Sequence, residues 1–85
     1  MTEKRALVTG GGKRLGLAMS RYLATRGHDV AVHYNSSRAG AEGAAHDIRA
    51  AGRTAALLQA DLLDEAQTER LVDRAADALG GPLTL

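Results

Sequence analysis

The chain has 85 residues, and its 45% hydrophobic and 25% charged residues are typical of one small globular domain rather than a disordered tail. A net charge of +1 and two aromatic residues argue against nucleic acid as a partner, and the lack of cysteine excludes disulfides and thiolate metal sites. Because no apolar stretch reaches the roughly 20 residues of a membrane helix and the N-terminal residues lack a signal-peptide core, we expect a soluble cytoplasmic protein with no membrane partner.

Short apolar runs alternate with longer periodic stretches along the chain, which indicates a βαβ rhythm. Residues 6–9 (ALVT) predict a buried strand that leads into a glycine-rich bend. After the bend, apolar residues recur at helical spacing until Gly27, which favours the end of a helix. The predicted inner stripe of this helix is Leu15, Ala18, Met19, Tyr22 and Leu23.

The next two strands and helices follow the same rhythm. Residues 29–34 and 54–60 predict strands, and residues 39–51 predict a helix rich in small residues between them. Asp64, with Gln67 three residues later, resembles a capping box that opens a last helix, which runs to Leu79. The buried faces of the two helices are predicted to be Ala41, Ala44, Ala45 and Ile48, and Leu71, Val72, Ala75 and Leu79.

The glycine-rich bend at VTGGGKRLG predicts an anion site. A strand that turns sharply into a helix directs unpaired backbone N–H groups and the positive helix end into the bend, which suits phosphate. Gly10, Gly12 and Gly16 are spaced G-x-G-x-x-x-G, one residue longer than the common dinucleotide fingerprint. A P-loop is disfavoured because Arg14 follows Lys13 where Ser or Thr should bind magnesium.

The bend resembles the short-chain dehydrogenase/reductase family, whose nucleotide turn reads T-G-x-x-x-G-x-G. Thr9, Gly10 and Gly16 match this motif, while Arg14 replaces its middle glycine. The sequence KRLG is similar to that of the pteridine and dihydromonapterin reductases of the family. The resemblance implies an α/β fold, a Rossmann-type doubly wound parallel sheet of which residues 1–85 form the N-terminal βαβαβα part. It also implies cofactor contacts from Gly10, Lys13, Arg14, Leu15 and Gly16.

The end of the second predicted strand favours NADP over NAD. An acid about 20 residues past the turn would bind the adenosine ribose and repel a 2′-phosphate, but this strand ends in a segment without an acid. Its amide, hydroxyls and cation, Arg38, suit phosphate oxygens. The alternative is that these residues only form a turn before the next helix. The predicted cofactor contacts are His33, Tyr34, Asn35, Ser36 and Ser37.

The family resemblance assigns the residues after the third strand to the adenine ring. These are Asp61 and Leu62, although Asp61 could equally be an ordinary loop acid. The three histidines have no metal-ligand spacing, so we predict no metal site. Tyr22 with Arg26, and Tyr34 with Arg38, are similar to the family's catalytic Y-x-x-x-K, but they stand too early in the chain and Tyr22 lies on a predicted buried stripe. No residue is therefore predicted to be catalytic.

The resemblance implies an NADPH-dependent oxidoreductase that transfers hydride to a C=O or C=N bond of a small-molecule substrate, with a pterin-like substrate favoured. A 3-oxoacyl thioester, sugar or steroid dehydrogenase is an alternative, and a non-catalytic NADP-binding regulator is a second. A fourth strand should pair with the first, so we expect residues 1–85 to be the N-terminal part of one longer NADP-binding domain. The catalytic residues would then lie downstream, and the full-length protein would be a homo-oligomer, a tetramer.

Overall fold

The three-layer arrangement is built on a parallel sheet with helices on both sides. The computed structural model describes residues 4–10, 14–36, 38–61 and 63–84. The strands pair in the order β1-β2-β3, all parallel, which confirms the predicted Rossmann-type βαβαβα fold. The elements are β1 (Lys4–Val8), α1 (Arg14–Thr25), β2 (His28–Tyr34), α2 (Arg38–Ala50), β3 (Ala55–Gln59) and α3 (Glu65–Leu79).

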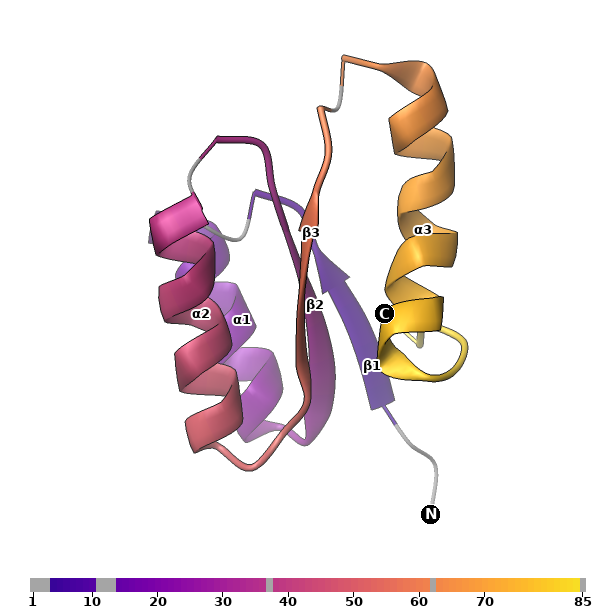
Figure 1. Cartoon of the computed structure of the whole chain (residues 1–85). Coiled ribbons are helices and arrows are strands. Elements are labelled where there is room, and N and C mark those ends of the chain that lie inside the picture. Colours follow the sequence, from indigo (N-terminus) through magenta and orange to yellow (C-terminus); the bar gives the residue numbers. More distant parts are fainter. Residues whose placement is uncertain (1–3, 11–13, 37, 62, 85) are drawn as a thin grey trace.

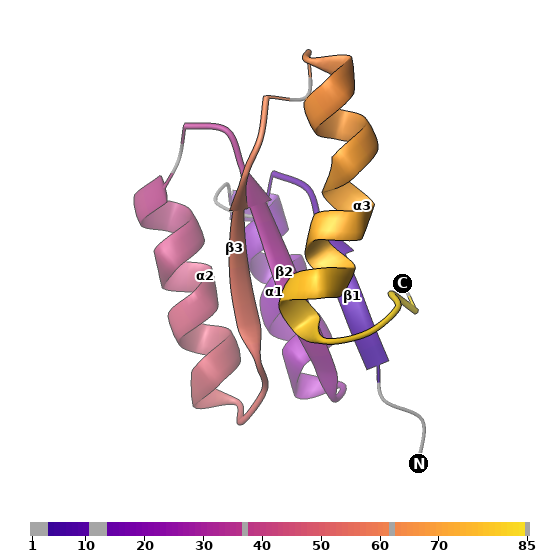
Figure 2. The same cartoon turned by 45° about the vertical axis from the view of Figure 1, so that its right-hand side comes forward.

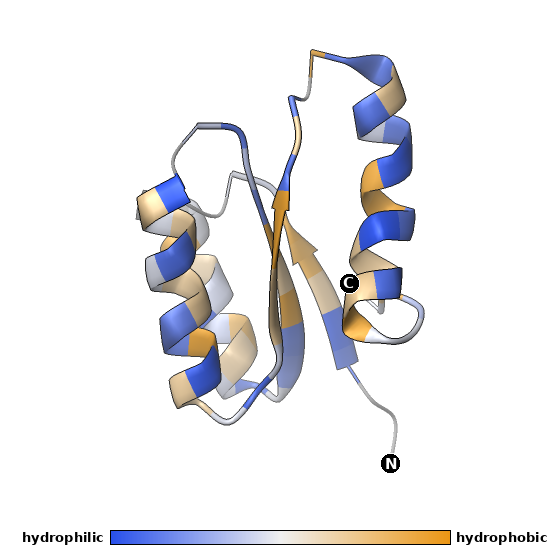
Figure 3. Ribbon diagram, viewed as in Figure 1, coloured by the Kyte–Doolittle hydropathy of each residue, from blue (hydrophilic) through white to orange (hydrophobic). Residues whose placement is uncertain are grey.

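The core has two halves because β2, the central strand, is buried on both of its faces. Val30 and Val32 point to the face covered by α1 and α2, where they pack with Ile48. Ala31 points to the other face, where α3 packs Leu71 against the sheet (Figure 1). This alternation is the two-residue period of a strand, and because β2 is covered on both faces, its central residues 30–32 are all apolar. Apolar residues accordingly follow the strands, whereas the helices carry hydrophilic residues along much of their length (Figure 3).

Four predicted core residues are exposed. Met19 and Tyr22 of α1 are 50% and 60% exposed, Val72 of α3 is 54% exposed, and Ala18 of α1 is also exposed, so their assignment to the buried stripes was wrong. In α1 the sheet is instead contacted by a face that includes Leu23 and Ala24. Val72 lies about 100° around the helix from Leu71, away from the row formed by Leu71, Ala75 and Leu79.

The strand and helix boundaries differ from the predicted ones by one or two residues. The strand β1 begins earlier than expected because the polar residues Lys4 and Arg5 also pair with β2, through His28 and Asp29. It ends at Val8 rather than at Thr9. The strand β3 spans only 55–59 instead of 54–60. The helix α2 spans 38–50 instead of 39–51, so both of its ends are shifted by one residue toward the N-terminus.

The start of α3 confirms one half of the predicted capping box. Asp64 is the N-cap, and its carboxylate accepts hydrogen bonds from the backbone N–H groups of Ala66 and Gln67. The Gln67 side chain, however, accepts from the backbone N–H of Asp61, at 3.0 Å, and donates to the Asp64 carboxylate. The reciprocal bond of a capping box is thus made to the loop before the cap instead of to the cap itself.

After α3 the chain returns to the sheet and runs beside its outer strand, β1. The backbone N–H of Thr84 donates to the carbonyl oxygen of Arg5, at 2.7 Å, and the Thr84 hydroxyl accepts from the backbone N–H of Arg5, at 3.0 Å. Figure 2 shows this end of the chain beside β1. The residues that follow α3 therefore lie along β1, where the sequence predicts a fourth strand.

Candidate functional site

The carboxyl ends of the three strands meet at one edge of the sheet, which α1 also faces with its N-terminus (Figure 1). Beyond β1 lies Gly10, beyond β2 lie Asn35 and Ser36, and beyond β3 lie Ala60 and Asp61. Parallel strands place all their carboxyl ends on the same side, so residues far apart in sequence become neighbours here. In open α/β sheets this edge is where ligands bind.

A buried histidine joins the three strand ends. His33, only 2% exposed, accepts a hydrogen bond at Nδ1 from the backbone N–H of Gly10, at 3.0 Å. Its Nε2 lies 2.8 Å from the carbonyl oxygen of Ala60. Because Gly10 N–H can only donate and Ala60 C=O can only accept, the imidazole is neutral and carries its proton on Nε2.

The glycine bend has a backbone shape that only glycine adopts without strain. Gly10 has φ +64°, in the left-handed region. Its N–H donates to His33 in this structure, and a cofactor contact from Gly10 stays a prediction.

The first turn of α1 carries no acidic residue, so its positive end is not neutralised from within the helix. Arg14, Leu15 and Gly16 lie in this turn, and Gly16 is buried, with its carbonyl oxygen accepting from the Ser20 hydroxyl at 2.8 Å. Lys13 and the side chains of Arg14 and Leu15 lie outside the described residues. The helix therefore begins directly after the glycine-rich segment, as the sequence predicts, and diphosphate binding at its N-terminus stays a prediction.

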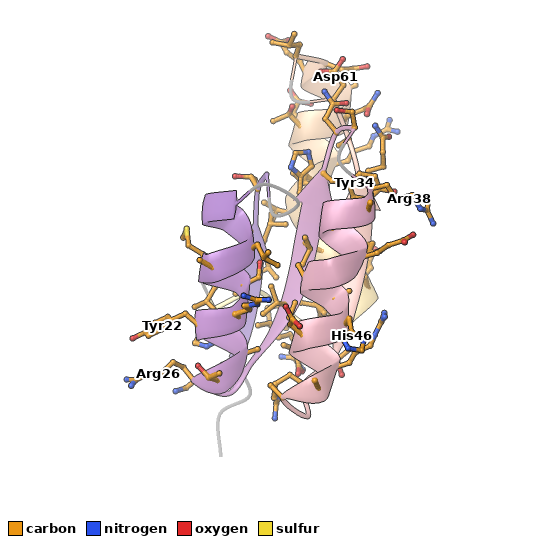
Figure 4. All side chains as sticks on the ribbon, turned by 90° about the vertical axis from the view of Figure 1, so that its left-hand side faces the viewer. Tyr22, Arg26, Tyr34, Arg38, His46 and Asp61 are labelled. Carbon is orange, nitrogen blue, oxygen red and sulfur yellow. The ribbon has the colours of Figure 1, made fainter. Side chains whose placement is uncertain are left out.

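The tip of β2 combines a buried tyrosine with exposed polar residues. The Tyr34 hydroxyl accepts from Nη1 of Arg38, at 3.3 Å, while Asn35 and Ser36 are exposed; Ser37 lies outside the described residues. Arg38 also donates to the Glu42 carboxylate, at 2.9 Å. This bond to Glu42 raises the pKa of Arg38, which stays cationic. Figure 4 shows Tyr34 and Arg38 close together near the start of α2, with Asp61 farther up and Tyr22 lower down on α1.

Two residues that the sequence did not reveal, Gln59 and Arg74, stabilise the end of β2 through hydrogen bonds to backbone carbonyl oxygens. The Gln59 side chain donates to the carbonyl oxygen of Asn35, at 3.2 Å. Arg74 of α3 in turn donates to the carbonyl oxygen of Gln59, at 3.0 Å. Neither contact has a local sequence signal, because each depends on the register of strands and helices that are distant in the chain.

Asp61 has a turn function at the end of β3. One of its carboxylate oxygens accepts from the backbone N–H of Leu63, at 2.9 Å, and its own N–H is bound by Gln67. The loop-acid alternative thus has a structural basis, and an adenine contact from this residue remains a prediction. Leu62 lies outside the described residues.

Away from the strand ends, the described residues offer an apolar hollow but no metal site and no membrane-spanning helix. No group of three or more His, Asp or Glu side chains among these residues is arranged to hold a metal ion, and none of the helices is long and apolar enough to cross a membrane. An apolar hollow of about 380 Å³ lies on α1, away from the strand ends, and is lined by Ala18, Met19, Tyr22 and Leu23. Arg26 lies over the exposed Tyr22 ring, 5.8 Å from its centre, and both point away from the candidate site (Figure 4).

The family model described as "short chain dehydrogenase" matches residues 4–85, nearly the whole chain. The chain belongs to the short-chain dehydrogenase family. A short-chain dehydrogenase from Burkholderia cenocepacia, solved in complex with NADP, is 44% identical, superposes with a TM-score of 0.87 and is matched over 93% of this chain. FolM alternative dihydrofolate reductase 1 from Brucella suis, also in complex with NADP, is 39% identical, with a TM-score of 0.83 over 94% of this chain.

Among curated relatives of this chain, a probable tetrahydroxynaphthalene reductase from Zymoseptoria tritici is 42% identical over 77 residues, or 91% of the chain. The chain spans about a third of the length of the proteins it matches: 29% of this reductase and 32% of each of the two solved structures. The comparisons confirm the predicted family and fold, and place the chain within an oxidoreductase family.

Proposed function

We propose that this chain forms the NADP-binding part of an NADPH-dependent reductase. The observation that carries the proposal is the edge where the strand ends meet: the bend at Gly10 opens onto the N-terminus of α1, and the neighbouring tip of β2 carries no acid. The bend and helix end suit a diphosphate, and the tip leaves room for a 2′-phosphate that an acid would repel. The two solved neighbours that contain NADP support the same cofactor.

The residue types present fit this cofactor by charge and by their capacity for hydrogen bonds. The N–H groups of the first turn of α1, with Lys13 and Arg14, would bind the diphosphate. Ser36, Ser37 and the cationic Arg38 would bind the 2′-phosphate, and Asp61 and Leu62 would lie beside the adenine ring. Bound NADPH would supply the hydride, and the chain described here would hold the other end of the molecule in place.

A C=O or C=N bond in a pterin ring is the substrate class we favour. The support is the KRLG sequence of the bend and the 39% identity to a dihydrofolate reductase, because dihydrofolate carries a pterin ring. The naphthalene reductase relative supports a carbonyl substrate on an aromatic ring as the second candidate. Oxidation of NADPH by the intact protein with a dihydropterin or with a cyclic ketone, followed by absorbance, separates the two.

A homotetramer in the cytoplasm remains a prediction, and light scattering of the intact protein tests the assembly.

Cofactor choice is tested by titrating the intact protein with NADPH and with NADH. Ser36 is exposed at the tip of β2, so Ser36→Asp adds a charge there without disturbing the core. We expect Ser36→Asp to weaken NADPH binding about tenfold or more and to leave NADH binding within about twofold, because only the 2′-phosphate is repelled. The matched control is Ser36→Asn, which has nearly the size of Asp but no charge. Equal losses for both cofactors, or for both variants, would contradict the proposal.

A further inference from the structure

We infer that His33 is a positioning residue, which sets the shape of the glycine bend through its neutral imidazole; this inference rests on the proposed NADP-binding function. The His33 side chain is too buried to reach a ligand directly, since it is 2% exposed and both ring nitrogens are used by backbone groups. Its influence on a cofactor must therefore pass through the groups that it binds.

The two partners of His33 are backbone groups that lie beyond the regular strand pairing. The pairing of β1 with β2 ends at Val8 and Val32, and Gly10 then turns away with a positive φ. On the other side, the pairing of β2 with β3 ends at Tyr34 and Gln59, and the N–H of Ala60 makes one more backbone bond, to the carbonyl oxygen of Tyr34. The imidazole thus continues the hydrogen bonding between the strands where the chain leaves the sheet, on both sides of β2 at once.

The directions of the two hydrogen bonds give His33 a specific chemistry. Nδ1 must accept, because its partner is the Gly10 N–H, and Nε2 must donate, because its partner is the Ala60 carbonyl oxygen. An apolar residue of similar size would fill the same space but leave the partly buried Gly10 N–H and the buried Ala60 carbonyl oxygen without these bonds. The Gly10 bond is the one that matters for the cofactor, since Gly10 begins the bend that leads into the N-terminus of α1.

Two amide variants separate these bonds. The Asn side-chain oxygen is attached to Cγ, as Nδ1 is in histidine, so His33→Asn retains an acceptor for Gly10 and loses the donor for Ala60. The Gln side-chain nitrogen is one bond farther out, as Nε2 is, so His33→Gln retains the donor for Ala60 and loses the acceptor for Gly10. His33→Leu removes both groups and retains the bulk.

The experiment measures the Kd of the intact protein for NADPH and NADH, together with its Tm. We expect His33→Asn to stay within about threefold of the wild type, and His33→Gln and His33→Leu to bind both cofactors about tenfold more weakly, with an unchanged preference between them. If His33 only fills space, the loss of cofactor affinity should follow the loss in Tm, and His33→Gln, with the larger side chain, should bind NADPH more tightly than His33→Asn. That ranking, or equal Kd values for Asn and Gln, would overturn the inference.

Nitrogen NMR of the wild-type imidazole gives an independent readout. We expect a neutral ring protonated on Nε2 alone, and a ring protonated on Nδ1 would overturn the inference. The two proposals fail differently. If the wild type binds no NADPH, or if Ser36→Asp does not change its preference for NADPH, the proposed function fails; if that preference behaves as expected but the Asn and Gln variants do not separate, only the role of His33 fails.

Discussion

Replacing Gly10 by alanine tests the glycine bend with unusual clarity, because the structure offers a matched control. Gly10 has φ +64°, and a Cβ built on it meets no atom of the described residues within 4 Å, its chain neighbours aside. Gly52, in the turn between α2 and β3, has φ +82° and equally open surroundings. Each substitution therefore adds backbone strain without a clash, and only Gly10 lies at the candidate site.

The expected loss of stability is similar for the two variants. An L-residue in the left-handed region costs about 1–2 kcal/mol relative to glycine, and no steric cost is added at either position. We expect urea unfolding of the intact protein to show a loss of about 1–2 kcal/mol for both Gly10→Ala and Gly52→Ala.

Cofactor binding should separate the two variants. If Gly10→Ala relaxes its strain by shifting φ, the hydrogen bond to His33 and the direction of the bend both change, and we expect the Kd for NADPH measured by titration calorimetry to rise about tenfold. Gly52→Ala should leave this Kd within about twofold. Equal Kd values for the two variants, at equal loss of stability, would refute the role given to the bend.

Three further predictions concern the tip of β2, the core and the start of α3. Arg38→Gln should weaken NADPH binding roughly fivefold and leave NADH binding unchanged in fluorescence titrations. The control Glu42→Gln removes the ion pair that competes for Arg38 and should not weaken NADPH binding. A loss of binding of both cofactors in Arg38→Gln would contradict the role given to Arg38. Ile48→Ala, at a fully buried position, should cost about 2–5 kcal/mol in urea unfolding, against less than about 0.5 kcal/mol for the half-exposed Met19→Ala, and similar losses would refute the described core. Asp64→Ala should cost about 1 kcal/mol in the same assay, because two backbone N–H groups lose their cap, and Asp64→Asn should recover most of it.

The order of elements could be predicted because each strand contains a short apolar run and these runs are separated by periodic helical stretches. The exposed positions of Met19 and Tyr22 could not, because the apolar period of a helix shows which residues are alike but not how much of the helix its neighbours cover. In α1 the covered face is narrower than the apolar stripe, and the sequence around Tyr22 contains no sign of this.

The site was predictable in its location and less so in its contacts. The glycine bend and the acid-free end of β2 have local signals, so the sequence places Gly10 and residues 33–37 in the candidate site, and their cofactor contacts stay predictions. That His33 turns inward could not be predicted, because its partners Gly10 and Ala60 are 23 and 27 residues away and become neighbours only through the strand register. The same holds for Gln59 and Arg74, whose contacts cross between elements.

A crystal structure of the intact protein with NADPH tests the central claim most directly. The account predicts the diphosphate against the first turn of α1, beside the bend at Gly10, and the 2′-phosphate at the tip of β2, near Ser36 and Arg38. The His33 imidazole should remain between Gly10 and Ala60, out of contact with the cofactor. NADPH bound away from this edge of the sheet, or with its 2′-phosphate directed away from β2, would contradict the account.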